Sequence, residues 1–217
     1  MVAPVVAGYR EDMTSPTPLT ALALNCTLTP SPGESSTELM TDQVLEALRE
    51  HGVDGRSVRV VDLDVKPGVE ADMGAGDAWP GIRQQMLGAD ILVIGTPTWV
   101  GHRSSVAQRV IERLDAELSM TDDEGRLETF GKVALTVVVG NEDGGHAITA
   151  GLFQSLNDVG FTIPANGGVY WNGEAMTTTD YKDLDETPKA VASTLKTMAA
   201  NAAHLARLLK QDRYPPA

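Results

Sequence analysis

The chain has 217 residues, of which 42% are hydrophobic, and its formal net charge is −13. A chain of this length and composition can bury one substantial core, so we expect a single domain. The negative charge argues against nucleic acid or an anionic membrane surface as the main partner, although backbone amides can still hold a phosphate. The one cysteine, Cys26, leaves no partner for an intrachain disulfide or a Cys-x-x-Cys metal site, so we expect no metal centre.

The sequence also bears on localisation. No apolar run reaches the roughly 20 residues that a membrane-spanning helix needs. The N-terminal stretch "MVAPVVAGYREDMTSPTP" lacks the basic start and the long apolar segment of a secretory signal. We therefore expect a cytoplasmic protein with no membrane partner. A loosely ordered extension over residues 1–18 should precede one domain over residues 19–212.

Apolar runs alternate with amphipathic stretches along that domain. Predicted strands cover residues 19–25, 58–63, 91–95, 132–139 and 161–164. Predicted helices cover residues 36–51, 79–87, 104–118, 146–159 and 184–211. Strands that are apolar throughout are typical of parallel strands buried on both faces. The alternation predicts an α/β fold, a three-layer α/β/α sandwich around a five-stranded parallel sheet.

Ligands of such sheets bind beyond the carboxyl ends of the strands, which draws attention to the loop after the first strand. This loop, "NCTLTPSPGESSTELM", carries hydroxyls on Thr27, Ser35, Ser36 and Thr37, where a helix begins. Hydroxyls beside the free amides of a helix N-terminus can bind a phosphate. The alternative is an ordinary serine N-cap. The loop has neither the dinucleotide-binding glycine pattern nor the P-loop pattern, which argues against both of those folds.

The loops after the third and fourth strands suit a flat ring better than a phosphate. In "GTPTWVG" (95–101), Pro97 fixes a turn, Gly101 allows a close approach of the backbone, and Trp99 offers a flat apolar face. The alternative is that Trp99 packs onto the following helix. In "VVVGNEDGGHAI" (137–148), Glu142 and Asp143 disfavour a phosphate, whereas amides could line the edge of a heterocycle. The three loops together predict a ligand with a phosphate at one end and a planar ring at the other.

These three loops, in this order and spacing, resemble those of the flavodoxin-like NAD(P)H-dependent FMN reductase family over about residues 19–210. The resemblance is nearest to the oxidoreductases related to iron–sulfur flavoproteins, but this chain lacks their cluster cysteines. It implies the flavodoxin-like strand order 2-1-3-4-5, with FMN as cofactor and NAD(P)H as co-substrate. It also implies cofactor-binding roles for residues in all three loops, namely Thr27, Ser35, Ser36 and Thr37 at the phosphate, Pro97, Thr98, Trp99, Val100 and Gly101 at one side of the ring, and Asn141, Glu142, Asp143, Gly144 and His146 at the other.

The resemblance implies an FMN-dependent oxidoreductase that passes hydride from NAD(P)H to a quinone, a flavin or a similar small-molecule acceptor. Because the flavin carries the redox chemistry, we name no catalytic side chain. The phosphate loop departs from the family pattern, since it is longer by "PSPGE" and has no basic residue. Two alternatives stay open, a flavodoxin-like electron carrier without NAD(P)H turnover and a non-flavin binding protein of the same fold.

The segment "VYWNGEAM" (169–176) adds an expectation about assembly. Two adjacent aromatics and a methionine follow the predicted fifth strand, and these residue types are enriched in interface cores. We therefore expect a homodimer or homotetramer with residues 170–176 near a neighbour's flavin. The alternative is that the aromatics cover the fifth strand of their own chain.

Overall fold

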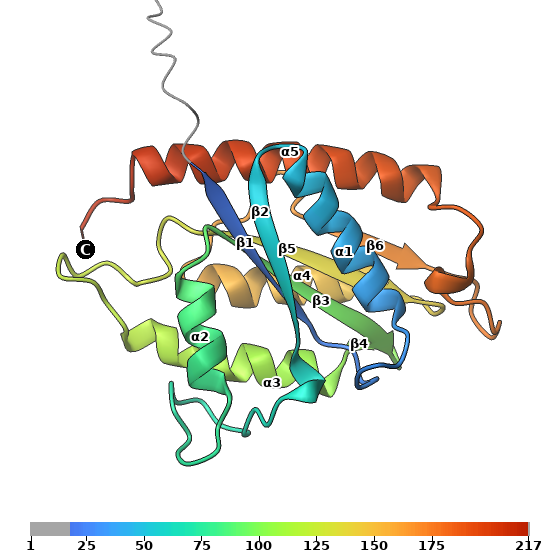
Figure 1. The fold of residues 1–217 in the computed structure, drawn as a ribbon, viewed down its shortest axis with the longest axis horizontal. Helices are drawn as coiled ribbons and strands as arrows, with labels where there is room; N and C mark the ends of the chain where they lie inside the picture. Colours follow the sequence, from blue (N-terminus) through green and yellow to red (C-terminus); the bar gives the residue numbers. More distant parts are fainter. Residues whose placement is uncertain (1–17, 217) are drawn as a thin grey trace, which may run out of the picture.

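The structure, a computed structural model, describes residues 18–216, so the predicted N-terminal extension lies outside it apart from residue 18. One central sheet is covered by helices on both faces, which confirms the three-layer α/β/α sandwich (Figure 1). The helices are α1 (Ser36–Arg49), α2 (Trp79–Leu87), α3 (Ser105–Leu114), α4 (Gly145–Asp158) and α5 (Lys189–Gln211). Three short 3-10 helices are η1 (Val60–Asp62), η2 (Asp115–Ser119) and η3 (Tyr181–Asp183).

Within residues 18–216 the sheet has six strands rather than the predicted five. Five of them are parallel in the spatial order β2-β1-β3-β5-β6, which is the flavodoxin-like order, and the short β4 pairs antiparallel with the end of β3. The strands are β1 (Leu19–Asn25), β2 (Val53–Arg59), β3 (Ile91–Trp99), β4 (His102–Arg103), β5 (Val133–Gly140) and β6 (Gly168–Asn172).

The continuous apolar runs of the central strands follow from burial on both faces. In β3, Ile91 and Val93 belong to the core that includes α1 and α5, whereas Leu92 and Ile94 belong to the core that includes α2, α3 and α4. Successive side chains of a strand point to opposite faces, so both sets must be apolar. All four side chains are at most 1% exposed. The sheet is therefore a rigid support for whatever lies at its carboxyl edge.

The second strand is not where the sequence predicted it. The expected strand covers residues 58–63, but pairing with β1 runs from Val53 to Arg59 and a 3-10 helix begins at Val60. β2 lies at an edge of the sheet, and its residues Asp54 and Arg56 are exposed. An edge strand in contact with water needs no apolar run, which explains why hydrophobicity misplaced it.

The predicted fifth strand is also wrong. Its residues 161–164 contribute only an isolated bridge between Thr162 and Val133, and the last parallel strand is β6. Tyr170 and Trp171 were expected to follow the last parallel strand, but they are part of that strand, β6. The run at 161–164 is apolar because Phe161, which is 1% exposed, fills the core without pairing.

β3 is longer than predicted, and this change shapes the site. The expected end is Gly95, whereas the strand continues to Trp99, which pairs with His102 of β4. The two residues between them, Val100 and Gly101, have φ values of 52° and 74°. Two consecutive positive φ values are the signature of a tight type I′ hairpin turn. The supposed loop is therefore a hairpin with Trp99 near its tip.

Helix ends differ from prediction in smaller ways. α1 ends at Arg49, two residues before the predicted end at residue 51. α3 stops at Leu114 and continues as η2. α5 begins at Lys189 rather than at residue 184, because Pro188 disfavours helical backbone in the residue before it. Within residues 18–216, no helix combines the length and hydropathy needed to cross a bilayer.

Candidate functional site

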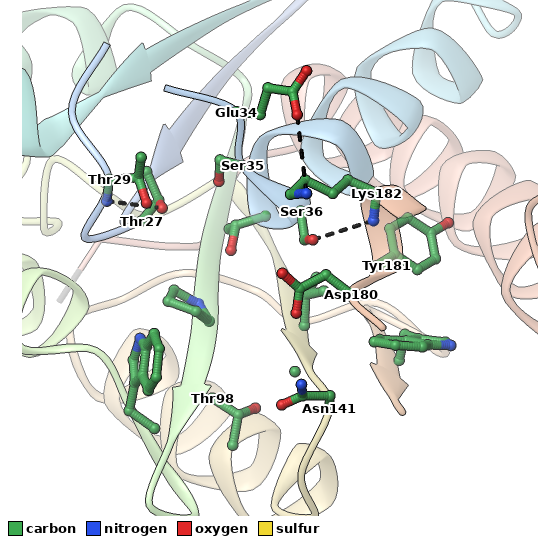
Figure 2. Close-up of a pocket in the computed structure, with 16 residues that line it drawn as sticks. Thr27, Thr29, Glu34, Ser35, Ser36, Thr98, Asn141, Asp180, Tyr181 and Lys182 are labelled. Carbon is green, nitrogen blue, oxygen red and sulfur yellow. Dashed lines mark hydrogen bonds and ion pairs between the residues drawn. The ribbon is translucent and has the colours of Figure 1, made fainter. Parts of the chain in front are cut away.

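A pocket opens at the carboxyl ends of the central strands (Figure 2). All three loops named from the sequence contribute to its lining, through Thr27, Ser35, Ser36, Thr37, Pro97, Thr98, Trp99 and Asn141. A fourth segment around η3, outside the three loops from which site residues were predicted, closes the pocket on the side of α1. The residues added by the structure are Thr29, Glu34, Val139, Gly140, Trp171, Asp180, Tyr181 and Lys182.

At the α1 end of the pocket, three hydroxyls each accept a hydrogen bond from a backbone N–H. The bonds run from Glu38 to Ser35, from Lys182 to Ser36 and from Thr29 to Thr27, each at 3.2 Å. A hydroxyl that accepts one bond still has its own O–H to donate. The N-cap alternative therefore holds for Ser35 without excluding a ligand, because the cap uses only its acceptor capacity. Three free O–H donors beside a helix N-terminus favour an anion.

Lys182 brings to this end the positive charge that the first loop lacks. Its backbone bond to Ser36 spans 146 residues of sequence. Its ammonium group lies 2.7 Å from the carboxylate of Asp183 and 3.9 Å from that of Glu34. The hydrogen bond to Asp183 raises the pKa of Lys182 above its usual value, so the amine is charged at neutral pH. This end of the pocket thus has a cation, although carboxylates surround it.

The η3 segment is held by a polar contact to α1 and by an aromatic contact to β6. The Tyr181 hydroxyl donates to Oε1 of Gln43 at 2.7 Å, and the Tyr181 ring lies 5.5 Å from the ring of Trp171. Tyr181 is 2% exposed, and burial raises its pKa. Asp180, the preceding residue, points its carboxylate into the pocket (Figure 2). No local sequence motif marks this segment, because its position comes from docking onto a distant helix.

At the other end of the pocket, Trp99 stands largely outside the core. It is 55% exposed, so the alternative that it packs onto the following helix does not hold. Gly140 allows its backbone to approach Thr98 closely, since a Cβ at position 140 would lie 2.7 Å from the Thr98 Cβ. The Trp99 end of the pocket offers a flat apolar surface that is open to solvent. Trp171 of β6 lines the pocket on the side of Tyr181, whose ring it contacts.

Thr98 supplies the clearest sign of a ligand. The residue is 4% exposed, and its buried Oγ1 has no hydrogen-bond partner within residues 18–216. An unpaired buried hydroxyl costs about 1–3 kcal/mol, so such groups usually have a partner. Thr98 and Asn141 carry their polar atoms toward each other across the pocket (Figure 2). A heterocycle with nitrogen and oxygen atoms at its edge would supply the missing partner.

Some predicted residues support the hairpin instead of lining the pocket. The Glu142 carboxylate accepts hydrogen bonds from the N–H groups of Val100 at 2.9 Å and Gly101 at 3.2 Å. Gly144 packs on Gly101, where a Cβ would lie 3.0 Å from the Gly101 carbonyl oxygen. The pocket lining excludes six predicted residues, namely Val100, Gly101, Glu142, Asp143, Gly144 and His146.

Comparison with known families gives the same assignment as the three loops. The family model described as NADPH-dependent FMN reductase matches residues 20–176. The chain belongs to this family. FMN reductases of this kind are FMN-dependent oxidoreductases of flavodoxin-like fold, so FMN and NAD(P)H are the molecules against which the pocket is judged.

The chain matches two curated relatives, but it covers very different shares of their lengths. It is 38% identical over 169 residues to a divalent metal cation transporter, MntH, of Mycobacterium bovis; this covers 76% of the chain but 25% of the transporter, so the chain spans only a quarter of that protein. It is 32% identical over 206 residues to 8-demethyl-8-aminoriboflavin-5'-phosphate synthase of Streptomyces davaonensis, which covers 90% of the chain and 80% of the synthase.

Solved structures extend the comparison. RosB with bound 8-demethyl-8-formylriboflavin-5'-phosphate has a TM-score of 0.80 and 31% identity, with 90% of this chain and 82% of RosB covered. An NADH:FMN oxidoreductase in its apo form has a TM-score of 0.57 and 19% identity, with 88% and 89% covered, which supports the fold alone.

Proposed function

We propose that the chain binds FMN in this pocket, accepts hydride from NAD(P)H and passes it to a quinone, a flavin or a similar acceptor. The observation that carries the proposal is the order of groups along the pocket. O–H donors and Lys182 lie at one end, and the unpartnered Thr98 hydroxyl and the exposed Trp99 lie at the other. FMN has the same order, with a phosphate, a chain of hydroxyls and a planar ring.

The phosphate would lie at the N-terminus of α1. Ser35, Ser36 and Thr27 donate their free O–H groups to it, while Lys182 and the helix amides offset its charge. Hydrogen bonds to a charged group contribute roughly 1.5–3 kcal/mol each. The Asp180 carboxylate is an acceptor for the hydroxyls of the ribityl chain. Thus the acid at the centre of the pocket and the cation at its end serve different parts of one ligand.

The ring would lie at the Trp99 end. Thr98 donates its hydroxyl to a heteroatom at the ring edge, and Trp99 borders the ring with its indole face. Bound FMN supplies the two-electron chemistry, and the chain positions it. Because Trp99 is exposed, a second substrate can reach this end of the pocket from solvent.

An absorbance spectrum with an FMN titration tests the first step, and oxidation of NADPH in the presence of a quinone tests the second. A flavodoxin-like carrier would bind FMN without oxidising NADPH. A non-flavin binding protein would show no flavin spectrum and no change in flavin fluorescence on titration. Either result would refute the proposed reductase.

The match to the synthase favours a second candidate, in which FMN is the substrate. The chain aligns with that synthase over 90% of its own length and with RosB at a TM-score of 0.80. In this case the same pocket holds a flavin whose 8-position is altered during turnover. Mass spectrometry of the flavin recovered after turnover separates the candidates, because a reductase returns FMN with its mass unchanged.

A further inference from the structure

A second cavity adjoins the β3–β4 hairpin. It is a groove of about 600 Å³ between the hairpin and the first two turns of α3 and α4. Small-molecule sites usually measure roughly 300–1,000 Å³, so the groove is large enough for a ligand. It shares no lining residue with the FMN pocket, but His102 of the groove pairs across the hairpin with Trp99 of the pocket. The two cavities are therefore neighbours that share one hairpin.

Arg103 gives this groove a positive charge that forms no direct ion pair within residues 18–216. Its Nε donates to Oε1 of Gln108 at 2.7 Å, and Gln108 donates in turn to Glu112 at 2.9 Å. Among the residues that the structure describes, the guanidinium forms no ion pair and no further hydrogen bond. Burial lowers the pKa of Arg103, and the charge of Glu112 acts in the opposite direction. Unused donors on a half-buried cation suit an anionic ligand.

The cations near the phosphate end of the FMN pocket form ion pairs, unlike Arg103 in the groove. Arg59 is paired with the carboxylate of Glu38, and Lys182 with that of Asp183. Both of those charges are therefore partly neutralised before any ligand binds. Arg103 is the cation beside the hairpin whose charge is not used in this way.

A glycine in α4 leaves room beside the guanidinium. Gly151 lies inside the helix, where glycine costs about 1 kcal/mol relative to alanine. A Cβ at this position would lie 3.5 Å from Nη1 of Arg103. Any larger side chain would extend into the groove next to the charge. The groove thus combines the Arg103 cation with open space beside it, which exists because Gly151 has no side chain.

We propose that this groove binds the phosphate groups of the nicotinamide dinucleotide and that Arg103 recognises them. The inference rests on the proposed NAD(P)H-dependent function. The chain carries a net charge of −13, so an anionic dinucleotide is repelled at long range and needs a local cation. The planar guanidinium matches two phosphate oxygens at once. Phosphates held beside the hairpin leave the nicotinamide end free to extend toward Trp99 and the flavin ring.

Calorimetric titration of the FMN-loaded protein with NADP⁺ and with ADP tests the assignment. Arg103→Gln should weaken both by about 10- to 100-fold, the loss expected for a charge-assisted contact, while the Kd for FMN stays unchanged. Arg109→Gln is the matched control. It removes the same charge from α3, where Arg109 donates to the Val65 carbonyl rather than lining the groove. Equal losses in both variants, or none in Arg103→Gln, would overturn the assignment.

Steady-state kinetics adds a readout that a general loss of structure would not give. Arg103→Gln should raise KM for NADPH at least about tenfold, whereas turnover of N-methyl-dihydronicotinamide, a hydride donor without phosphates, should not change. Arg103→Lys keeps the charge but not the planar guanidinium, so its KM for NADPH should lie between those of the wild type and Arg103→Gln. This variant also provides a test if Arg103→Gln folds poorly. Wild-type protein that binds FMN but neither binds NADP⁺ nor oxidises NADPH would refute the proposed function itself. Wild-type protein that oxidises NADPH, with an unchanged KM in Arg103→Gln, would refute only the groove.

Discussion

The Glu142 carboxylate accepts hydrogen bonds from the backbone N–H groups of Val100 and Gly101, at 2.9 Å and 3.2 Å. Val100 has a φ of 52°, a conformation that β-branched residues rarely adopt. Its side chain is 84% exposed, so packing does not offset the strain. The carboxylate is the group that stabilises this turn. Since the turn follows Trp99 directly, Glu142 fixes the aromatic edge of the pocket from outside its lining.

Glu142→Ala should therefore loosen the hairpin and weaken FMN binding by about 5- to 30-fold, which corresponds to one or two kcal/mol. Val100→Gly removes the cause of the strain, because glycine adopts positive φ readily. The double variant should recover most of the lost affinity, measured by quenching of flavin fluorescence. Tighter binding in Glu142→Ala would instead mean that the carboxylate competes with the flavin for the two amides.

The unpartnered hydroxyl of Thr98 leads to a prediction with opposite effects on stability and on binding. Thr98→Val keeps the shape of the side chain but removes the unpaired hydroxyl. The free energy of unfolding of the flavin-free protein should therefore rise by about 1 kcal/mol. FMN should bind about tenfold less tightly. Thr136→Val is the matched control, because its Oγ1 is also buried and unpartnered but does not line the pocket. Urea unfolding and an FMN titration of both variants check the prediction. Equal FMN affinities in the two variants would contradict the role of Thr98.

Ser35 allows helix capping to be separated from phosphate binding. Its side chain caps α1 by accepting from the Glu38 N–H. Aspartate is as good an N-cap as serine, so Ser35→Asp should keep the stability of the helix but place a negative charge at the phosphate site. We expect FMN binding to fall by at least about tenfold while riboflavin, which has no phosphate, binds as before. Ser35→Ala should lower stability by about 1 kcal/mol. If Ser35→Asp leaves the affinity for FMN unchanged, the FMN phosphate does not bind at the N-terminus of α1.

Central elements of this fold could be predicted from the sequence because burial dictates their composition. β1 and α2 were predicted with their observed ends, and β3 was predicted up to Gly95. The hydroxyl loop and the site of Trp99 were also evident, since ligands of a parallel sheet meet at its carboxyl edge. The edge strands β2 and β6 were misplaced, as each has a partner on one side only and needs no continuous apolar run.

The cation of the site could not be predicted at all. Lys182 reaches Ser36 only because the buried Tyr181 anchors η3 on α1, a contact between segments far apart in sequence. Likewise, the role of Glu142 toward Val100 depends on a hairpin that the sequence suggested was an open loop. Residue types marked the region of the site, whereas the pairing of charges within it is a property of the tertiary structure.

Trp99→Ala tests the aromatic edge directly. Because Trp99 is 55% exposed, its removal should change the free energy of unfolding by less than about 1 kcal/mol. The absorbance spectrum and fluorescence of bound flavin should change, since the ring loses a neighbouring indole. Trp79→Ala is the contrast, because this tryptophan is fully buried and its loss should cost about 3–5 kcal/mol. If flavin affinity merely follows stability across both variants, Trp99 does not border the ring.

The expected homodimer or homotetramer concerns the far edge of the sheet. β6 is an edge strand, and within residues 18–216 no strand covers its outer side. Tyr170 on this strand is 37% exposed, and Met176 just beyond it is fully exposed. Since Trp171 of the same strand lines the FMN pocket, a second subunit seated here would add a wall to the substrate site. Large aromatics and methionine favour such an interface.

Light scattering at micromolar concentration should give at least twice the mass of one chain. Met176→Glu places a charge in the proposed interface and should shift the protein toward the monomer with a loss of turnover. Leu208→Glu is the control, because Leu208 is a 48% exposed apolar residue near the C-terminal end of α5 and outside the segment 169–176. A monomer with full NADPH:quinone activity would show that one chain completes the site alone. In that case Tyr170 simply shields the edge of its own sheet.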